Sequence, residues 1–202
     1  MNMKIKTLIL IFGLLCCITK EAMALEGTQH FENYLNSLKT LSGNFIQRNS
    51  HGQTSSGTIQ ISRPGKMRLT YNPPSPLLIV ADGKWLVTKD RDADQVDYVS
   101  LENTPAAFIL RPQIRFSGAD MEVISVVAKG KETEVSLVRT EDPDGGYITL
   151  VFQENPLTLK EWRIVDAQGV ETRVVLSNIK SNIPLPAGLF DIESPNIIQR
   201  IF

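Results

Sequence analysis

The clearest alternation of apolar and polar residues in the chain surrounds a short break. Before the break, Ile59 and Ile61 fall on one face of a strand, and after it Met67 and Leu69 resume the same pattern. The break is Arg63-Pro64-Gly65, in which proline removes a backbone donor and glycine permits a tight turn. This pattern predicts a β-hairpin that has one apolar face and an arginine at its corner.

Strand-like runs of the same kind continue along most of the chain. Turn signals such as Asp82-Gly83, a typical two-residue hairpin connection, separate them. The other expected strands are residues 45–48, 77–81, 84–89, 95–99, 122–128, 134–139, 147–153, 158–166 and 170–178. Short strands at regular spacing predict a mainly β fold, an antiparallel meander that forms a barrel or a strongly curved sheet.

Two segments carry helical signals instead. In the first, residues 28–41, apolar residues recur at the spacing of one helix face. They are Phe31, Tyr34, Leu35, Leu38 and Leu41. Glu32 and Lys39 lie on the polar side, which lacks the basic band of a membrane-surface helix. We therefore expect the apolar stripe to pack on the protein's own sheet.

The second helical segment, residues 104–110, is short and almost entirely apolar. Thr104 is a good N-cap and Pro105 suits the first helical position. Arg111-Pro112 ends the segment, and Phe116 follows in a loop. A helix this apolar does not lie free on a surface, so the two helices together are expected to cover one face or mouth of the sheet.

The first 24 residues have the pattern of a secretory signal peptide. Lys4 and Lys6 form its basic region, residues 8–18 its apolar region, and Ala22-Met23-Ala24 its cleavage site. The apolar region is too short for a bilayer core, which needs roughly 20 residues. The sequence therefore predicts a soluble, exported protein that begins at Leu25 and forms one domain over residues 25–202.

Cys16 and Cys17 lie inside this signal segment. Neither follows the small residue that lipoprotein processing requires, so we expect no lipid anchor. Cleavage removes three of the 21 Lys and Arg residues and one of the 22 Asp and Glu residues, which leaves a net charge of −3. A nucleic-acid partner is not expected, because it requires a clustered basic surface.

The chain lacks the residue patterns that catalysis or metal binding would need. His30 lies in the first helix and His51 in a turn, with no serine elbow near either. Residues 90–94 resemble the start of a calcium loop, but Gln95 and Leu101 stand where its glycine and glutamate should be. We therefore expect no enzyme, no catalytic residue, no metal and no cofactor.

What remains is apolar surface along the strands, and alternation alone fits a solid core as well as a cavity. Two features favour a cavity: the sheet is large for the helical material that fills it, and Pro105 and Pro112 break the covering segment. Met67 is the best single cavity residue, since its flexible side chain adapts to varied ligands. A packed-core role for it stays open.

The hairpin also carries a family resemblance. Arg63-Pro64-Gly65-Lys66-Met67-Arg68 is followed by Tyr71, Pro74 and an aliphatic run into Asp82-Gly83. The order of these residues resembles the periplasmic outer-membrane lipoprotein carriers, the LolA family. The resemblance extends to Phe45, Gln47, Thr104-Pro105 and residues 190–195. Only seven residues follow that last segment, whereas carriers of the family can run longer.

The resemblance implies an incomplete antiparallel β-barrel, a half-barrel, closed by a lid of short helices over an apolar cavity. The cavity would hold the acyl chains of lipoproteins, and Arg63 would lock the lid through hydrogen bonds. On the residues alone, Arg63 reads as a surface arginine beside a turn. The expected cavity residues are Ile59, Ile61, Met67, Leu69, Ile79, Trp85, Phe108, Ile109, Leu110, Phe116, Trp162 and Ile164.

The resemblance also implies a monomeric carrier that takes lipoproteins from an inner-membrane ABC releasing complex to an outer-membrane acceptor or the membrane itself. A competing hypothesis is a periplasmic lipid- or glycolipid-binding or sensing module of the same architecture. The sequence also leaves open a solid-core interaction domain and, as the weakest hypothesis, a hydrolase.

Overall fold

The computed structural model describes residues 19–118, 120–186 and 188–191. One antiparallel sheet dominates it, with two α-helices and two short 3-10 helices. In chain order the elements are α1 (Thr19–Ser37), β1 (Thr40–Asn49), β2 (Thr54–Ser62), β3 (Lys66–Tyr71), β4 (Leu77–Asp82), β5 (Trp85–Asp90), β6 (Gln95–Ser100), η1 (Leu101–Asn103), α2 (Ala106–Leu110), β7 (Met121–Lys129), β8 (Glu132–Arg139), η2 (Pro143–Gly145), β9 (Gly146–Gln153), β10 (Thr158–Asp166) and β11 (Glu171–Ser181).

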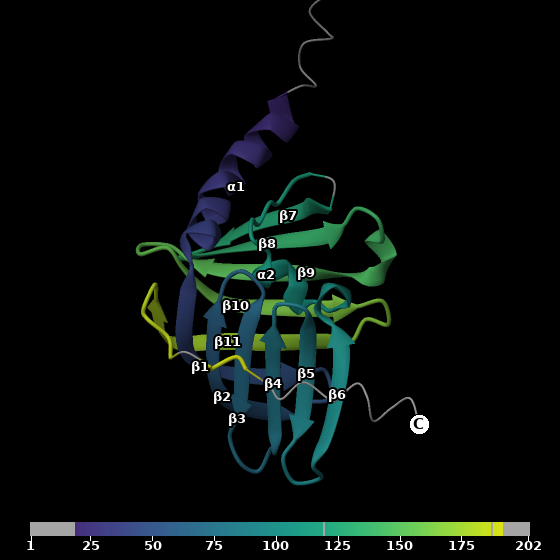
Figure 1. The fold of residues 1–202 in the computed structure, drawn as a ribbon. Coiled ribbons are helices and arrows are strands. Elements are labelled where there is room, and N and C mark those ends of the chain that lie inside the picture. Colours follow the sequence, from purple (N-terminus) through teal and green to yellow (C-terminus); the bar gives the residue numbers. More distant parts are fainter. Residues whose placement is uncertain (1–18, 119, 187, 192–202) are drawn as a thin grey trace, which may run out of the picture.

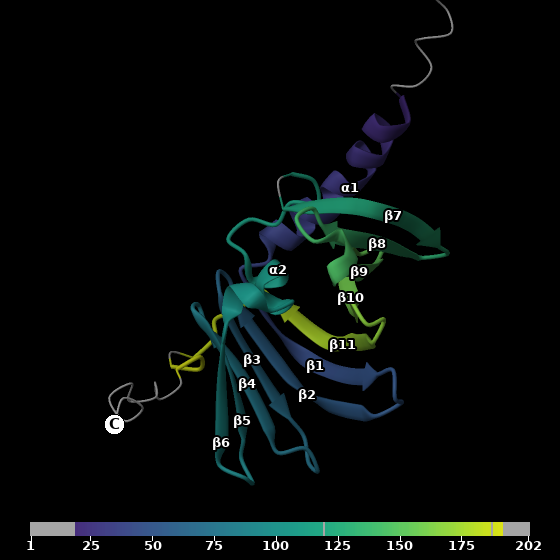
Figure 2. The same ribbon diagram turned by 90° about the vertical axis from the view of Figure 1, so that its right-hand side faces the viewer.

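The chain builds one half of the sheet from the middle outward and the other half from the edge inward. Its strand order is β6-β5-β4-β3-β2-β1-β11-β10-β9-β8-β7, so β1 pairs with both β2 and β11 (Figure 1). The chain runs from β1 to the edge at β6 and crosses to the other edge at β7. It then returns strand by strand to β11. The crossover carries η1 and α2, which places α2 where the two edges face each other (Figure 2).

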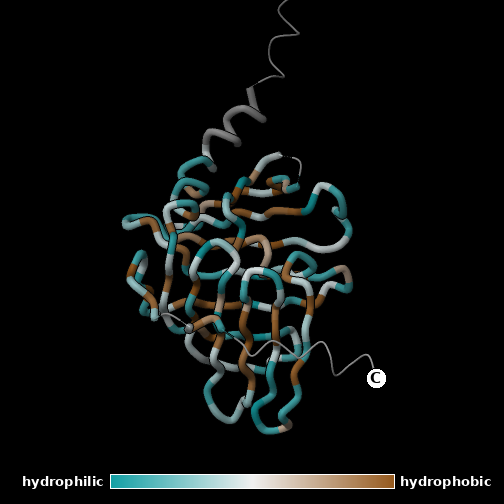
Figure 3. The backbone as a smooth tube through the Cα atoms, in the orientation of Figure 1, coloured by the Kyte–Doolittle hydropathy of each residue, from teal (hydrophilic) through white to brown (hydrophobic). Residues whose placement is uncertain are grey.

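The two edge strands do not pair with each other, so the strongly curved sheet remains open (Figure 2). The predicted mainly β half-barrel is therefore confirmed. Apolar positions gather along the strands, whereas the hairpin turns are mostly hydrophilic (Figure 3). Within the described residues, no helix is both long enough and apolar enough to cross a membrane.

The first helix differs from its prediction at both ends. It begins at Thr19 rather than at residue 28 and ends at Ser37, so Leu41 is a buried residue of β1. The stripe residues Phe31 and Leu35 are buried as expected. Phe31 stacks on Phe152 of β9, with ring centroids 4.5 Å apart. Of the expected signal segment, residues 1–18 lie outside the described part of the chain, and its cleavage stays a prediction.

Three consecutive strands meet at a glycine beneath two aromatic rings. Gly57 of β2 lies in register with Phe45 of β1 and Tyr71 of β3. The two rings contact edge to face across it, with centroids 5.0 Å apart. The Tyr71 hydroxyl donates to Gln47, and burial raises the pKa of this tyrosine. A side chain at Gly57 would occupy the space that the Phe45 ring fills.

Replacing Gly57 by alanine is expected to destabilise the sheet by more than about 2 kcal/mol, as overpacking of a core does. The new Cβ would collide with the Thr70 carbonyl oxygen and lie 2.8 Å from Cε1 of Phe45. Urea unfolding measures the effect. Gly27→Ala in α1 is the matched control, because its Cβ meets open space and alanine favours a helix. Equal stability of the two variants would contradict the close approach of Gly57 to Thr70 and Phe45.

Candidate functional site

Arg63, at the corner between β2 and β3, joins both helices to the sheet. Its Nη2 donates to the Arg111 carbonyl oxygen at 2.6 Å, and its Nε donates to the same oxygen at 3.1 Å. Its Nη1 donates to the carbonyl oxygen of Leu35, which lies in the last turn of α1. The same nitrogen lies 3.5 Å from the carbonyl oxygen of Leu38, the residue just after α1. A single side chain therefore fastens the ends of α1 and α2 to one hairpin turn.

The chemistry of these acceptors explains why an arginine suits the position. The last carbonyl groups of a helix have no partner within the helix and carry partial negative charge. A guanidinium offers five donors in one plane and so can serve several of these oxygens at once. Burial lowers the pKa of the half-buried Arg63. Its ordinary pKa is so high that the group stays charged.

The backbone of the same turn adds two more bonds. The Gly65 amide donates to the Leu110 carbonyl oxygen at 2.8 Å, and the Arg63 amide donates to the Lys39 carbonyl oxygen at 2.8 Å. The Gly65 φ of +79° lies in the left-handed region that glycine tolerates. The turn predicted from Arg63-Pro64-Gly65 is thus the surface on which the C-terminal end of α2 rests.

A second set of contacts joins α1 to the loop after α2. Asn36 Nδ2 donates to the Ile114 carbonyl oxygen, and the Ile114 amide donates to Asn36 Oδ1, both at 2.8 Å. The Phe116 amide donates to Glu32 Oε1, also at 2.8 Å. Glu32 is only 8% exposed, so its assignment to a polar helix face was wrong. Glu32 and Asn36 are four residues apart beside the apolar stripe, and this spacing was the only sequence signal for the pair.

The apolar interior beneath Arg63 is almost filled. The enclosed space there is about 20 Å³, which is little more than one water molecule requires. It is lined by Leu35, Leu38, Thr40, Leu41, Ile61, Arg63, Ile109, Ile114, Leu159 and Trp162. Side chains of both helices and of the crossover loop therefore occupy the centre of the half-barrel. Any further apolar group fits there only after some of them move.

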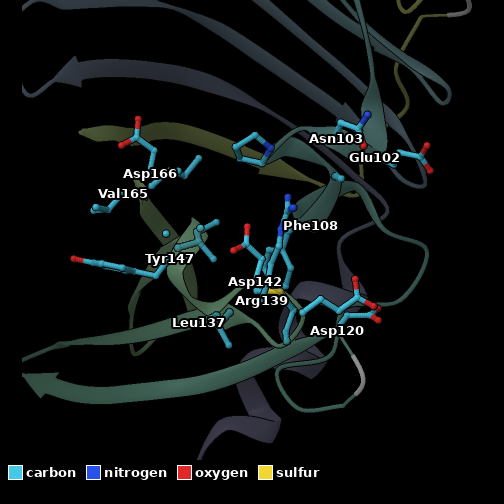
Figure 4. Close-up of a pocket in the computed structure, with 18 of the residues that line it drawn as sticks. Glu102, Asn103, Phe108, Asp120, Leu137, Arg139, Asp142, Tyr147, Val165 and Asp166 are labelled. Carbon is cyan, nitrogen blue, oxygen red and sulfur yellow. The ribbon is translucent and has the colours of Figure 1, made fainter. Parts of the chain in front are cut away.

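A larger pocket of about 440 Å³ opens between α2 and the ends of β8, β9 and β10 (Figure 4). Phe108, Leu137 and Ile164 give it an apolar part. Polar and charged side chains such as Asp120 and Asp166 surround that part (Figure 4). A third hollow of about 660 Å³ lies outside the lid, next to the β2–β3 and β4–β5 turns. Of the three, only the small enclosed space has a lining that is nearly all apolar.

The predicted cavity residues divide among several environments. Ile61, Ile109 and Trp162 line the enclosed space, and Phe108 and Ile164 line the 440 Å³ pocket. Ile59, Met67, Leu110 and Phe116 are buried in the core, with Leu69 and Ile79 packed against it. That these residues contact a ligand stays a prediction.

The structure does not bring Trp85 together with the other predicted cavity residues. Ala81 pairs with Leu86, so Leu86 faces the core, whereas Trp85 and Val87 lie on the other side of the sheet. Trp85 is 38% exposed. The sequence Trp85-Leu86-Val87 is apolar on both faces, so its alternation could not indicate which face points inward.

The N-terminal side of α2 also differs from its prediction. The Thr104 hydroxyl donates back to the Leu101 carbonyl oxygen at 2.7 Å instead of capping α2. Pro105 occupies the N-cap position, and the helix starts at Ala106. Across the described residues, no three His, Cys, Asp or Glu side chains are grouped as a metal site would require.

The sequence profile of the family described as "Outer membrane lipoprotein carrier protein LolA" matches residues 36–193. That match contains β1 to β11, the Arg63 corner and the whole crossover. The chain belongs to the LolA family.

Named relatives of this LolA family member extend over most of its length. The outer-membrane lipoprotein carrier protein of Legionella pneumophila (strain Corby) is 31% identical over 202 residues, which are 93% of this chain and 96% of the relative. That of Cupriavidus necator is 30% identical over 185 residues, 83% of this chain and 84% of the relative. The crystal structure of a DUF1329 family protein from Desulfovibrio piger shares the fold, with a TM-score of 0.54 at 10% identity over 84% of this chain and 96% of that one.

Met67 gives a direct test of how closed the interior is in solution. It is 5% exposed and lies in register between Ile61 and Ala81. Met67→Glu is therefore expected to lower the free energy of unfolding by about 3–5 kcal/mol, because it places an unpaired carboxylate in the core. Lys66→Glu, on the exposed face of the same strand, is the control for the added charge. Unchanged stability of Met67→Glu, with loss of a fluorescent apolar probe, would instead mean that Met67 lines an accessible cavity.

Proposed function

We propose that this protein is a carrier that shields the acyl chains of lipoproteins inside its half-barrel and catalyses no reaction. The observation that carries the proposal is the Arg63 lock. One half-buried cationic side chain holds two helices over an interior that is apolar and almost filled. Membership of the LolA family and the names of the relatives support lipoproteins as the cargo.

Loading requires the lid to leave the interior. Ile109 of α2 lines the enclosed space, and Arg63 together with Gly65 holds the end of that helix. Breaking these bonds frees α2 to move, and an acyl chain then takes the place of lid side chains against the same strands. In the closed form the lid fills the site, so closure and cargo binding compete. Arg63 thereby favours the empty carrier and the release of cargo.

The transport route follows from the same proposal. The signal-like residues 1–24 support export to the periplasm, where one domain formed by residues 25–202 would act as a monomer. There the carrier would receive lipoproteins from an inner-membrane ABC releasing complex and pass them to an outer-membrane acceptor or to the membrane.

Mass spectrometry of the molecules that co-purify from the native periplasm tests the cargo class. Lipoproteins are expected. Free glycolipids would favour a lipid-binding or sensing module, and an empty protein under loading conditions would favour a solid core.

The lock itself is tested by Arg63→Leu in a transfer assay with a labelled lipoprotein. Each hydrogen bond to the guanidinium is worth roughly 1.5–3 kcal/mol, so the open and closed forms should come closer in energy. Loading is expected to persist or improve, whereas release to an acceptor is expected to fail. Arg63→Lys should restore release only in part, because an ammonium lacks the planar fork.

Arg68→Leu is the matched control for loss of an arginine. Arg68 lies in the same hairpin but donates to the Leu189 carbonyl oxygen at 3.0 Å, away from both helices. It should load and release cargo normally. Normal release of cargo by Arg63→Leu would mean that Arg63 has only a structural role at the turn and does not lock the lid.

A further inference from the structure

The loop that follows α2 is held by α1, independently of most of the contacts that hold α2 itself. Ile114 exchanges two hydrogen bonds with the Asn36 side chain, and Phe116 donates one to Glu32. The side chains of Ile114 and Phe116 are fully buried. The Phe116–Glu32 bond is buried and the two Asn36–Ile114 bonds are partly buried, so losing a partner in either place is costly.

The helix α2, by contrast, is held at its C-terminal end by the β2–β3 turn. Arg63 binds the Arg111 carbonyl oxygen, and Gly65 binds the Leu110 carbonyl oxygen. Only Pro112 and Gln113, both exposed, separate Arg111 from Ile114. The two sets of contacts meet at two points. Asn36 Oδ1 also receives Arg63 Nη2 at 3.4 Å, and the Phe116 ring stacks on Phe108 of α2 with centroids 6.5 Å apart.

We propose that Glu32 and Asn36 are positioning residues that keep Ile114 and Phe116 anchored to α1 while α2 swings away, an inference that rests on the proposed carrier function. The lid then has a latch at residues 110–111, which Arg63 releases, and an anchor at residues 114–116, which stays. The exposed link at residues 112–113 absorbs the motion, as short loop segments do in hinged lids.

The division of the crossover into a latch that moves and an anchor that stays determines which side chains the cargo replaces. Ile109 and Ile114 both line the enclosed space, but they stand on opposite sides of the link. Ile109 leaves with α2, whereas Ile114 remains as a fixed wall together with Phe116. The anchor thus prevents the whole crossover from detaching and gives α2 a defined closed position to return to.

Hydrogen exchange of single amides in the ¹⁵N-labelled full chain tests the anchor without any cargo. The Gly65 amide reports the latch, and the Ile114 and Phe116 amides report the anchor. In Arg63→Leu, protection of Gly65 is expected to fall about tenfold, whereas Ile114 and Phe116 should stay within about twofold of the native protein. Equal loss at all three amides would overturn the proposal, because the crossover would then open as one piece.

Substitutions in the anchor should give the reverse pattern. Asn36→Ala is expected to lower protection of Ile114 about tenfold, and Glu32→Ala that of Phe116, with Gly65 less affected. Glu32→Gln keeps an oxygen acceptor and should restore Phe116. Asn33→Ala is the matched control, since Asn33 is exposed on the same helix and its side chain accepts a hydrogen bond from Gln29 of that helix.

Native protection of Ile114 in Asn36→Ala would also overturn the anchor. If that variant fails to fold, the hydrogen-exchange pattern of Arg63→Leu is sufficient to test the anchor, because this variant leaves Glu32 and Asn36 intact. Failure of cargo transfer with the anchor pattern preserved would reject the carrier function and not the anchor.

Discussion

One cationic side chain, that of Arg63, joins both helices to the sheet, and its hydrogen-bond acceptors are neutral oxygens. Arg63 reaches Leu35 and Arg111, which lie 28 and 48 residues away in the chain. Carboxylate partners would have made a stronger and more permanent lock. Carbonyl groups at helix ends accept water readily when the arginine leaves, so the net cost of breaking each bond stays modest. Under the proposed function, such bonds would be strong enough to define a closed form and weak enough to open.

A second constraint comes from packing. Protein interiors do not tolerate large voids, so an apolar cavity without cargo must be filled by something. Here Ile109 and Ile114 from the crossover meet Trp162 from the sheet and leave about 20 Å³. In the proposed carrier, these side chains occupy the space in which acyl chains would bind. Under the proposed function, the stability of the empty carrier and its affinity for cargo are coupled, because both use the same strand surfaces.

The sequence predicted the sheet better than the contacts around the lid. All eleven strands and the Arg63 corner followed from alternation and turn residues, which are local signals. Trp85 was placed on the wrong face because its strand is apolar on both sides and only the register with β4 distinguishes them. Glu32 and Asn36 were missed because their partners are backbone groups of residues 114 and 116, more than 75 positions away. No side-chain pattern marks such a pairing.

Under the proposed function, the small energies of the lid contacts would decide between loading and release, because the hydrophobic energy of the cargo largely cancels. Each methylene taken from water gains about 0.8 kcal/mol, and whole acyl chains would bind beyond the ~18–21 kcal/mol limit of known affinities. Transfer from a bilayer to an apolar cavity, however, moves the chain between two similar environments. The remaining difference is of the order of the few kcal/mol that separate open from closed forms. In the proposed carrier, a hinge with a releasable end at Arg63 and a retained end at Glu32 and Asn36 would let hydrogen bonds of that size set the direction of transfer.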